Sequence, residues 1–174
     1  MSKLIIFNLL SSIVSFSQLS FLKSVAILTL IFNLTLIIHE LAHYITAIKK
    51  RVPVISVNFG FTKELAEVYP EYKEIISKLP EVRVGKYRFS LIPLWGWGGV
   101  KIDPNSPVKD KISVFKAGGV INLIILVILL PVILLQPYHP FLFIFAFTNL
   151  VSGLNLLPFW GDGKEIKNLS LMTQ

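Results

Sequence analysis

Two histidines and a glutamate stand together inside a long apolar stretch of this sequence. Residues 39–43 read H-E-L-A-H, which fits the pattern H-E-x-x-H. Residues four apart lie on one face of a helix, so His39 and His43 can direct imidazole nitrogens at a single metal ion. Glu40 would lie beside the first ligand, close enough to take a proton from water at an open coordination position. This is the arrangement that a zinc peptidase requires.

The same short pattern could arise by chance, or the histidines could be hydrogen-bonded within a helix bundle. Two of the three histidines in the chain lie in it, however, within the apolar run from Val25 to Ile48. A charged group at mid-membrane costs roughly 2.5 to 3.5 kcal/mol on insertion scales, so such groups are rare and usually functional. We therefore interpret His39 and His43 as metal ligands and Glu40 as a general base.

The composition is that of a membrane protein. Hydrophobic residues make up 53% of the 174 residues and the mean hydropathy is +0.69, which is too apolar for an ordinary soluble domain. The formal net charge is +7, which membrane orientation explains without a nucleic-acid partner. The chain has no cysteine, so disulfides and thiolate metal ligands are excluded.

The apolar runs predict an α-helical multi-pass membrane protein that forms a single domain over residues 1–174. About four transmembrane helices are expected, because about 20 apolar residues cross a bilayer. The expected spans are residues 4–22, 25–48, 112–135 and 141–157. The first run has no convincing cleavage site for a signal peptide and is expected to be a retained helix. An interfacial helix is the alternative for it.

A polar insertion, residues 51–111, separates the second and third spans and is expected to be a small β-containing unit, cytoplasmic or interfacial. Residues 52–61 alternate in polarity and predict a strand, and residues 82–91 predict a strand pair around a Gly-Lys turn. Residues 62–79 predict a short amphipathic helix. Residues 91–100 are apolar, aromatic and rich in glycine, which is also typical of an interfacial anchor with a flexible turn.

The lysines and arginines predict the orientation. Those in or near the polar connections fall mostly on one side of four spans, beginning with the run Lys49-Lys50-Arg51, and only Lys23 falls on the other. The positive-inside rule then places both termini and the insertion in the cytoplasm of a cell-membrane protein. The metal would lie within the membrane, nearer the cytoplasmic face.

Four segments, taken in order, resemble the site-2 protease family of intramembrane zinc metalloproteases. Residues 39–43 match the family's zinc motif, and residues 117–122 (AGGVIN) resemble its Ala-Gly-Pro-x-x-Asn signature, with glycine in place of proline. Residues 155–163 (NLLPFWGDG) resemble its Asn-x-x-Pro…Asp-Gly signature, with one residue fewer before the aspartate. Residues 93–101 resemble a Pro-Leu-Gly-Gly-Tyr-Val segment that forms a strand or loop near the active site. No PDZ-like or CBS-like domain is seen, so the resemblance is to a minimal member.

The resemblance implies one Zn²⁺ per chain, held by His39, His43 and Asp162, with Glu40 as the catalytic base. It also implies cleavage in or near a transmembrane segment, with a single-span membrane protein or a signal-peptide remnant as substrate in the lipid bilayer. Elimination among the other acidic residues also favours Asp162, which follows an apolar helix. The Asp-Gly pair could instead be only a turn at the helix end.

Several alternatives remain at this stage. Asn122 and Asn155 could bind the substrate backbone or the oxyanion, or could form hydrogen bonds between helices. The protein could be an inactive relative that binds zinc or a partner helix, although the intact Glu40 argues against this. A metal transporter would be expected to carry more acidic or histidine residues across several helices than this chain does.

Overall fold

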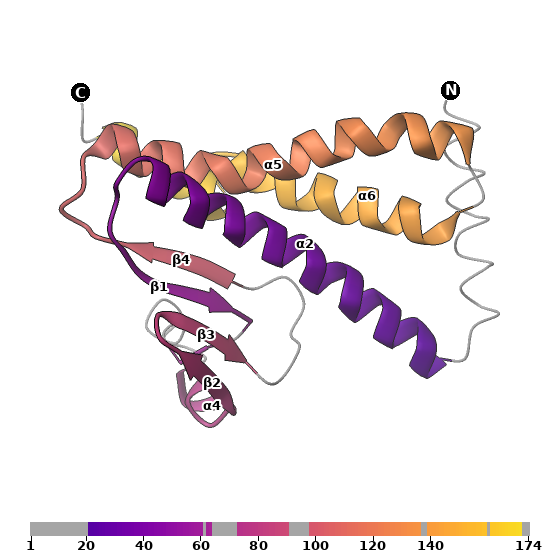
Figure 1. Ribbon diagram of the computed structural model, residues 1–174, viewed down its shortest axis with the longest axis horizontal. Coiled ribbons are helices and arrows are strands. Elements are labelled where there is room, and N and C mark those ends of the chain that lie inside the picture. The colour runs from indigo at the N-terminus through magenta and orange to yellow at the C-terminus, as the bar shows by residue number, and fades with distance from the viewer. Residues whose placement is uncertain are drawn as a thin grey trace.

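The computed structural model describes residues 21–60, 62–63, 73–90, 98–136, 139–159 and 161–171. Its helices are α2 (Phe21–Lys49), α4 (Lys73–Ser77), α5 (Val108–Leu135), α6 (Pro140–Gly153) and α7 (Gly161–Leu171), with a 3-10 turn, η2 (Leu154–Leu156). Its strands are β1 (Val54–Phe59), β2 (Glu81–Val84), β3 (Tyr87–Ser90) and β4 (Gly98–Ile102). In Figure 1 the long helices α2, α5 and α6 form one layer, and the small sheet lies along α2 on the side away from α6.

Three stretches of the described residues are long and apolar enough to cross a membrane. They are Lys23–Lys49, Val108–Leu135 and Pro140–Leu171. They correspond to the expected spans 25–48, 112–135 and 141–157. The expected span 4–22 lies outside the described residues, except that its last two residues belong to α2. A mostly helical membrane fold with a small sheet is therefore confirmed, and the fourth span stays a prediction.

The outward faces of the long helices are apolar. On α2 they form a stripe with the three- and four-residue spacing of one helix face, comprising Leu30, Leu34, Ile37, Leu41, Ile45 and Ile48. The inward face of the same helix carries buried polar groups instead, among them Thr35, whose hydroxyl lies 3.0 Å from that of Thr148 on α6. A helix that is apolar outside and polar inside is typical of a membrane bundle, because lipid covers the outer face.

The last span is interrupted at Leu157, at the end of the helix expected over residues 141–157, and the final turn of that helix is 3-10 and not α. The α-helix ends at Gly153 and η2 follows. Proline disfavours the helical conformation of the residue before it, and Leu157, which precedes Pro158, is extended with φ −67° and ψ 140°. At a rise of about 1.5 Å per residue, α6 alone is about 21 Å long and falls short of the bilayer core.

The residues after Pro158 form a further helix, α7, which lies beyond the last span expected from the sequence. Gly161 begins this helix with φ +35°, a conformation that glycine adopts without the steric cost paid by other residues. The next residue is Asp162, in the first turn of α7. Interrupted helices at membrane depth are tolerated where the freed backbone is buried in protein or lines a cavity. The break therefore brings Asp162 back toward the bundle.

The sheet has the strand order β2-β3-β1-β4. β1 pairs in parallel with β3 and antiparallel with β4, while β2 and β3 form an antiparallel hairpin. The strand expected in residues 52–61 and the strand pair expected in residues 82–91 are thus confirmed. α5 already begins at Val108, after Pro107, so the last four residues of the expected insertion, 108–111, are helical. Residues 64–72 and 91–97, where the rest of a short helix and the aromatic segment were expected, lie outside the described residues.

The turn after α2 ties the sheet to the helices. The N–H of Val52 donates to the carbonyl of Ala47 and that of Arg51 to Ile48, with Arg51 at φ +56°. This is the hydrogen-bond pattern of a Schellman cap, which commonly includes an apolar contact across the turn. Here the apolar contact extends into a buried cluster that joins α2, the turn before β1, β4 and α5, made up of Ala47, Val52, Ile102 and Val114.

Candidate metal centre

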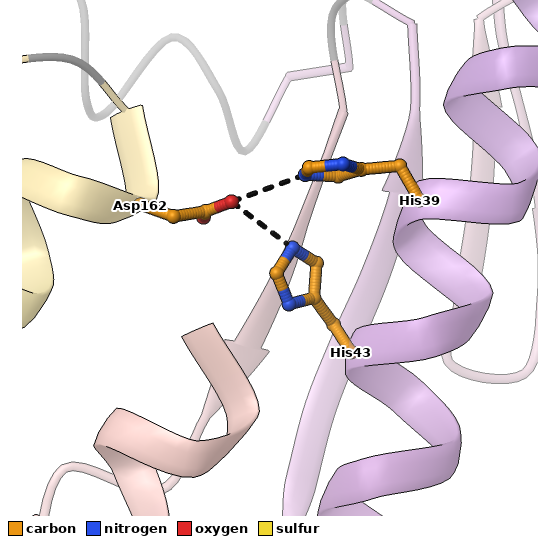
Figure 2. A group of neighbouring side chains, drawn as sticks. All are labelled: His39, His43 and Asp162. Atoms are coloured by element: carbon orange, nitrogen blue, oxygen red, sulfur yellow. Dashed lines mark hydrogen bonds and ion pairs between the residues drawn. The ribbon is translucent and has the colours of Figure 1, made fainter. Parts of the chain in front are cut away.

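His39 and His43 lie one helical turn apart on the inner face of α2. Their side chains are buried, with 6% and 3% of each residue exposed. The two rings meet edge to face, with centroids 4.7 Å apart. Figure 2 shows both rings leaving α2 on the same side. The helical spacing of the motif therefore places both imidazoles together, as the sequence predicts.

Asp162 reaches the same point from α7. Its Oδ2 atom lies 3.1 Å from Nε2 of His39 and 3.3 Å from Nε2 of His43. Dashed lines mark both contacts in Figure 2. One ligand atom from each of the three residues lies within 4.8 Å of the others. Ligand atoms about 2.0 to 2.1 Å from a tetrahedral zinc are about 3.3 Å apart. The two separations between Oδ2 and the Nε2 atoms are close to that spacing, so the three side chains could hold a zinc ion.

The second ring nitrogen of each histidine also has a partner. Nδ1 of His43 donates to the backbone carbonyl of Val114 on α5, at 2.7 Å. Nδ1 of His39 lies 2.9 Å from the side-chain amide of Asn122, also on α5. Such contacts fix the tautomer and the orientation of a metal-binding imidazole. α5 therefore supports both histidines from behind.

Gly118 of α5 leaves the space in which the two Nε2 atoms converge. A Cβ atom at this position would meet Nε2 of His43 and would lie 2.6 Å from Nε2 of His39. No side chain larger than hydrogen fits there unless the histidines move. The backbone of α5 thus lies close to the two Nε2 atoms, and glycine at this position leaves the space beside them open.

Glu40 lies at the edge of the same site. Only 3% of it is exposed, and its Oε2 atom has no hydrogen-bond partner among the described residues. It is close enough to interact electrostatically with His39, His43 and Asp162. A Cβ on Gly98, the first residue of β4, would lie 3.0 Å from its Oε1. The carboxylate therefore lies between the three candidate metal ligands and the start of β4.

The two asparagines singled out from the sequence lie in different places. Asn122 is fully buried against His39. Asn155 lies on η2, where its Oδ1 atom would be 3.3 Å from a Cβ on Gly161, the residue before Asp162. His139 lies in the segment before α6 and is not among the three clustered residues. The structure thus brings His39, His43, Asp162, Glu40 and Asn122 together, with Asn155 next to the helix that carries the aspartate.

Two contributors to the site were missed by the sequence analysis. The acceptor on Val114 is a backbone carbonyl, so the residue type carries no signal for it. Gly118 lay within a recognised motif, but its role depends on how closely α5 approaches α2. The one sign of this role in the sequence was the spacing of Gly118 and Asn122, which are four residues apart and therefore on the same helix face.

Comparison with known proteins gives one family. A family model described as "Peptidase family M50" matches residues 26–139. The matched range contains His39, Glu40, His43, Gly118 and Asn122, and it ends before η2 and α7. No curated protein and no solved structure matches.

Replacement of Gly118 by alanine should abolish metal binding, because the added methyl group would occupy the space at the two Nε2 atoms. Gly119→Ala is the matched control. It adds the same methyl group to the same helix, but there the group meets the side chain of Leu156. Zinc content after purification should fall to near zero in Gly118→Ala and persist in Gly119→Ala. Equal zinc content in the two variants would show that Gly118 does not border the metal.

Asp162→Ala should lose zinc, because it removes the carboxylate that faces both histidines. Glu165→Ala removes an exposed carboxylate from the same helix, three residues further on, and should keep the metal. The measurement is zinc per chain after washing with a chelator of moderate strength. Full zinc occupancy in the Asp162 variant would refute the assignment of the third ligand.

Proposed function

The chain belongs to peptidase family M50, the site-2 protease family, and from that premise we propose that it is an intramembrane zinc metalloprotease. Family membership implies a membrane metallopeptidase in general. The more specific proposal is hydrolysis of peptide bonds in or near the transmembrane segments of membrane-anchored substrates. Its main support is the convergence of His39, His43 and Asp162 beside a buried glutamate, between helices able to cross a membrane.

In the proposed hydrolysis, three residues of the chain hold the metal and a fourth transfers the proton. His39, His43 and Asp162 would hold the metal through two nitrogens and one oxygen, the ligand set of many catalytic zinc sites. Zinc bound there would polarise the scissile carbonyl and lower the pKa of water toward 7. Glu40 takes a proton from the attacking water as the new C–O bond forms, and passes it to the amine nitrogen as the C–N bond breaks.

Asn155 is our candidate for stabilising the oxyanion or holding the substrate backbone. It lies on η2, beside the residue that precedes Asp162, and its amide can donate hydrogen bonds. Groups that donate to the developing oxyanion commonly contribute several kcal/mol to transition-state stabilisation. The half-buried position of Asn155 leaves it more accessible to a substrate than the fully buried Asn122.

Strand β4 is our candidate for binding the unwound substrate. A transmembrane helix hides its carbonyls in internal hydrogen bonds, so it must open locally before any of them can be attacked. β4 is an edge strand of the four-stranded sheet, and its first residue, Gly98, lies against Glu40. A substrate strand added to this edge by β-augmentation would run toward the catalytic base. Suitable substrates are single-span membrane proteins and signal-peptide remnants.

Glu40→Gln should lower cleavage by about 10² to 10⁴-fold, the usual contribution of a general acid-base group. It should leave zinc bound, because Glu40 is proposed as a base and not as a ligand. The assay is cleavage of a panel of single-span peptides in detergent, with zinc content measured on the same preparations. Wild-type protein that holds zinc but cleaves no peptide would favour the inactive relative. A Glu40→Gln protein with near-wild-type turnover would contradict the mechanism.

We also propose that the two termini and the insertion are cytoplasmic, from the distribution of lysine and arginine. Introduced cysteines test this cleanly, because the chain has none of its own. A cysteine at exposed Lys73 in α4 should resist an impermeant reagent applied to intact cells. A cysteine at exposed Gln136, at the far end of α5, should react with it. The reverse pattern would reject the orientation.

A further inference from the structure

One face of α5 packs against both histidines of the candidate metal centre. Val114, Gly118 and Asn122 are spaced four residues apart, so they follow each other along one side of the helix. Each contacts the histidines differently. The first accepts a hydrogen bond from His43, the second leaves space at both Nε2 atoms, and the third lies against His39. This regularity indicates that α5 orients the ligands as well as packing against them.

A histidine that binds metal through Nε2 must carry its proton on Nδ1. That N–H is a strong donor, and when it is buried it needs an acceptor. For His43 the acceptor is the carbonyl of Val114. For His39 the neighbour is the side-chain amide of Asn122, 2.9 Å away and fully buried. Each imidazole therefore has one partner on α5. If Nε2 binds the metal, that partner must accept a hydrogen bond from the Nδ1–H.

The orientation of the amide follows from this requirement. In the structure, Nδ2 of Asn122 faces Nδ1 of His39, and Oδ1 has no partner among the described residues. The oxygen and nitrogen of an amide are distinguished by their hydrogen bonds and not by shape. If the amide is turned, its oxygen accepts from the Nδ1–H, and its NH₂ group occupies the position without a partner. Only the turned amide leaves the lone pair of His39 Nε2 available for a metal.

We propose that Asn122 is the positioning residue of His39, with its amide oxygen accepting the Nδ1–H hydrogen bond that directs Nε2 toward the metal. The inference rests on the proposed function, because it needs a metal on His39. It gives Asn122 a different role from the substrate or oxyanion binding that the sequence suggested. A positioning residue acts on metal affinity, whereas an oxyanion donor acts on turnover alone.

Three variants separate these roles. Asn122→Leu removes the acceptor at similar volume and should weaken zinc binding by about 10 to 100-fold, the usual effect of losing an outer hydrogen bond to a ligand. Asn122→Asp keeps an acceptor and removes the donor, so its zinc affinity should stay within a few-fold of wild type. Asn149→Leu is the matched control. Asn149 is equally buried but bonds to the carbonyl of Phe145 within α6, so this variant should keep wild-type affinity.

The zinc dissociation constant is measured by competition with a chelator, after thermal unfolding has shown that each variant is folded. Nuclear magnetic resonance of the zinc-loaded wild type provides a readout that does not depend on the variants. The His39 Nδ1–H proton, assigned by its loss in His39→Gln, should resonate at the low field typical of a hydrogen-bonded N–H. A resonance typical of an N–H without an acceptor would overturn the proposal, even if Asn122→Leu failed to fold.

Failure of the inference differs from failure of the proposed function. If wild-type protein binds no zinc, the proposed function is wrong and the inference falls with it. If wild type and Asn122→Leu bind zinc equally well, only the inference is wrong. If the aspartate variant loses zinc as severely as the leucine variant, an acceptor at this position does not suffice for zinc binding, and the proposed acceptor role is overturned.

Discussion

One carboxylate and two imidazoles meet between helices whose outer faces are apolar, and the surrounding residues supply partners that offset the cost of burying them. Polar atoms inside a membrane protein need partners, because lipid offers none. His43 finds one in the Val114 carbonyl and His39 in the Asn122 amide. The break in the last span brings the third group inward. The same groups that make the site costly to bury are those able to hold a metal.

Sequence reasoning could locate the site because its strongest signals are local. The spacing of His39 and His43 within a helix gives the metal-binding face directly, and the polarity of these groups is conspicuous in an apolar segment. Asp162 was harder, because it is 123 residues from His39 in the chain. What identified it was its place after an apolar helix and the family resemblance. Neither one shows that the chain turns into a new helix there.

The remaining features depend on tertiary contacts that residue types do not encode. α7 contains two glycines and several charged residues, which are poor signals of a packed helix, yet it is helical and packs against α5. The parallel pairing of β1 with β3 joins segments that are separated by α4 and β2. The close approach at Gly118 is set by how two helices cross. The sequence pattern predicts most helices and strands of this fold, whereas the contacts between them depend on how they pack.

The arrangement of the ligands along the chain has a consequence for biogenesis. His39, Glu40 and His43 enter the membrane with α2, whereas Asp162 follows only after α5 and α6. Because a chain is made and folded from its N-terminus onward, the nascent protein carries the two candidate histidine ligands and the candidate base while the third candidate ligand is still unsynthesised. The candidate metal centre is complete only when α7 docks. Until then, the proposed protease would have an incomplete metal site and would be unable to cleave the other chains inserted nearby.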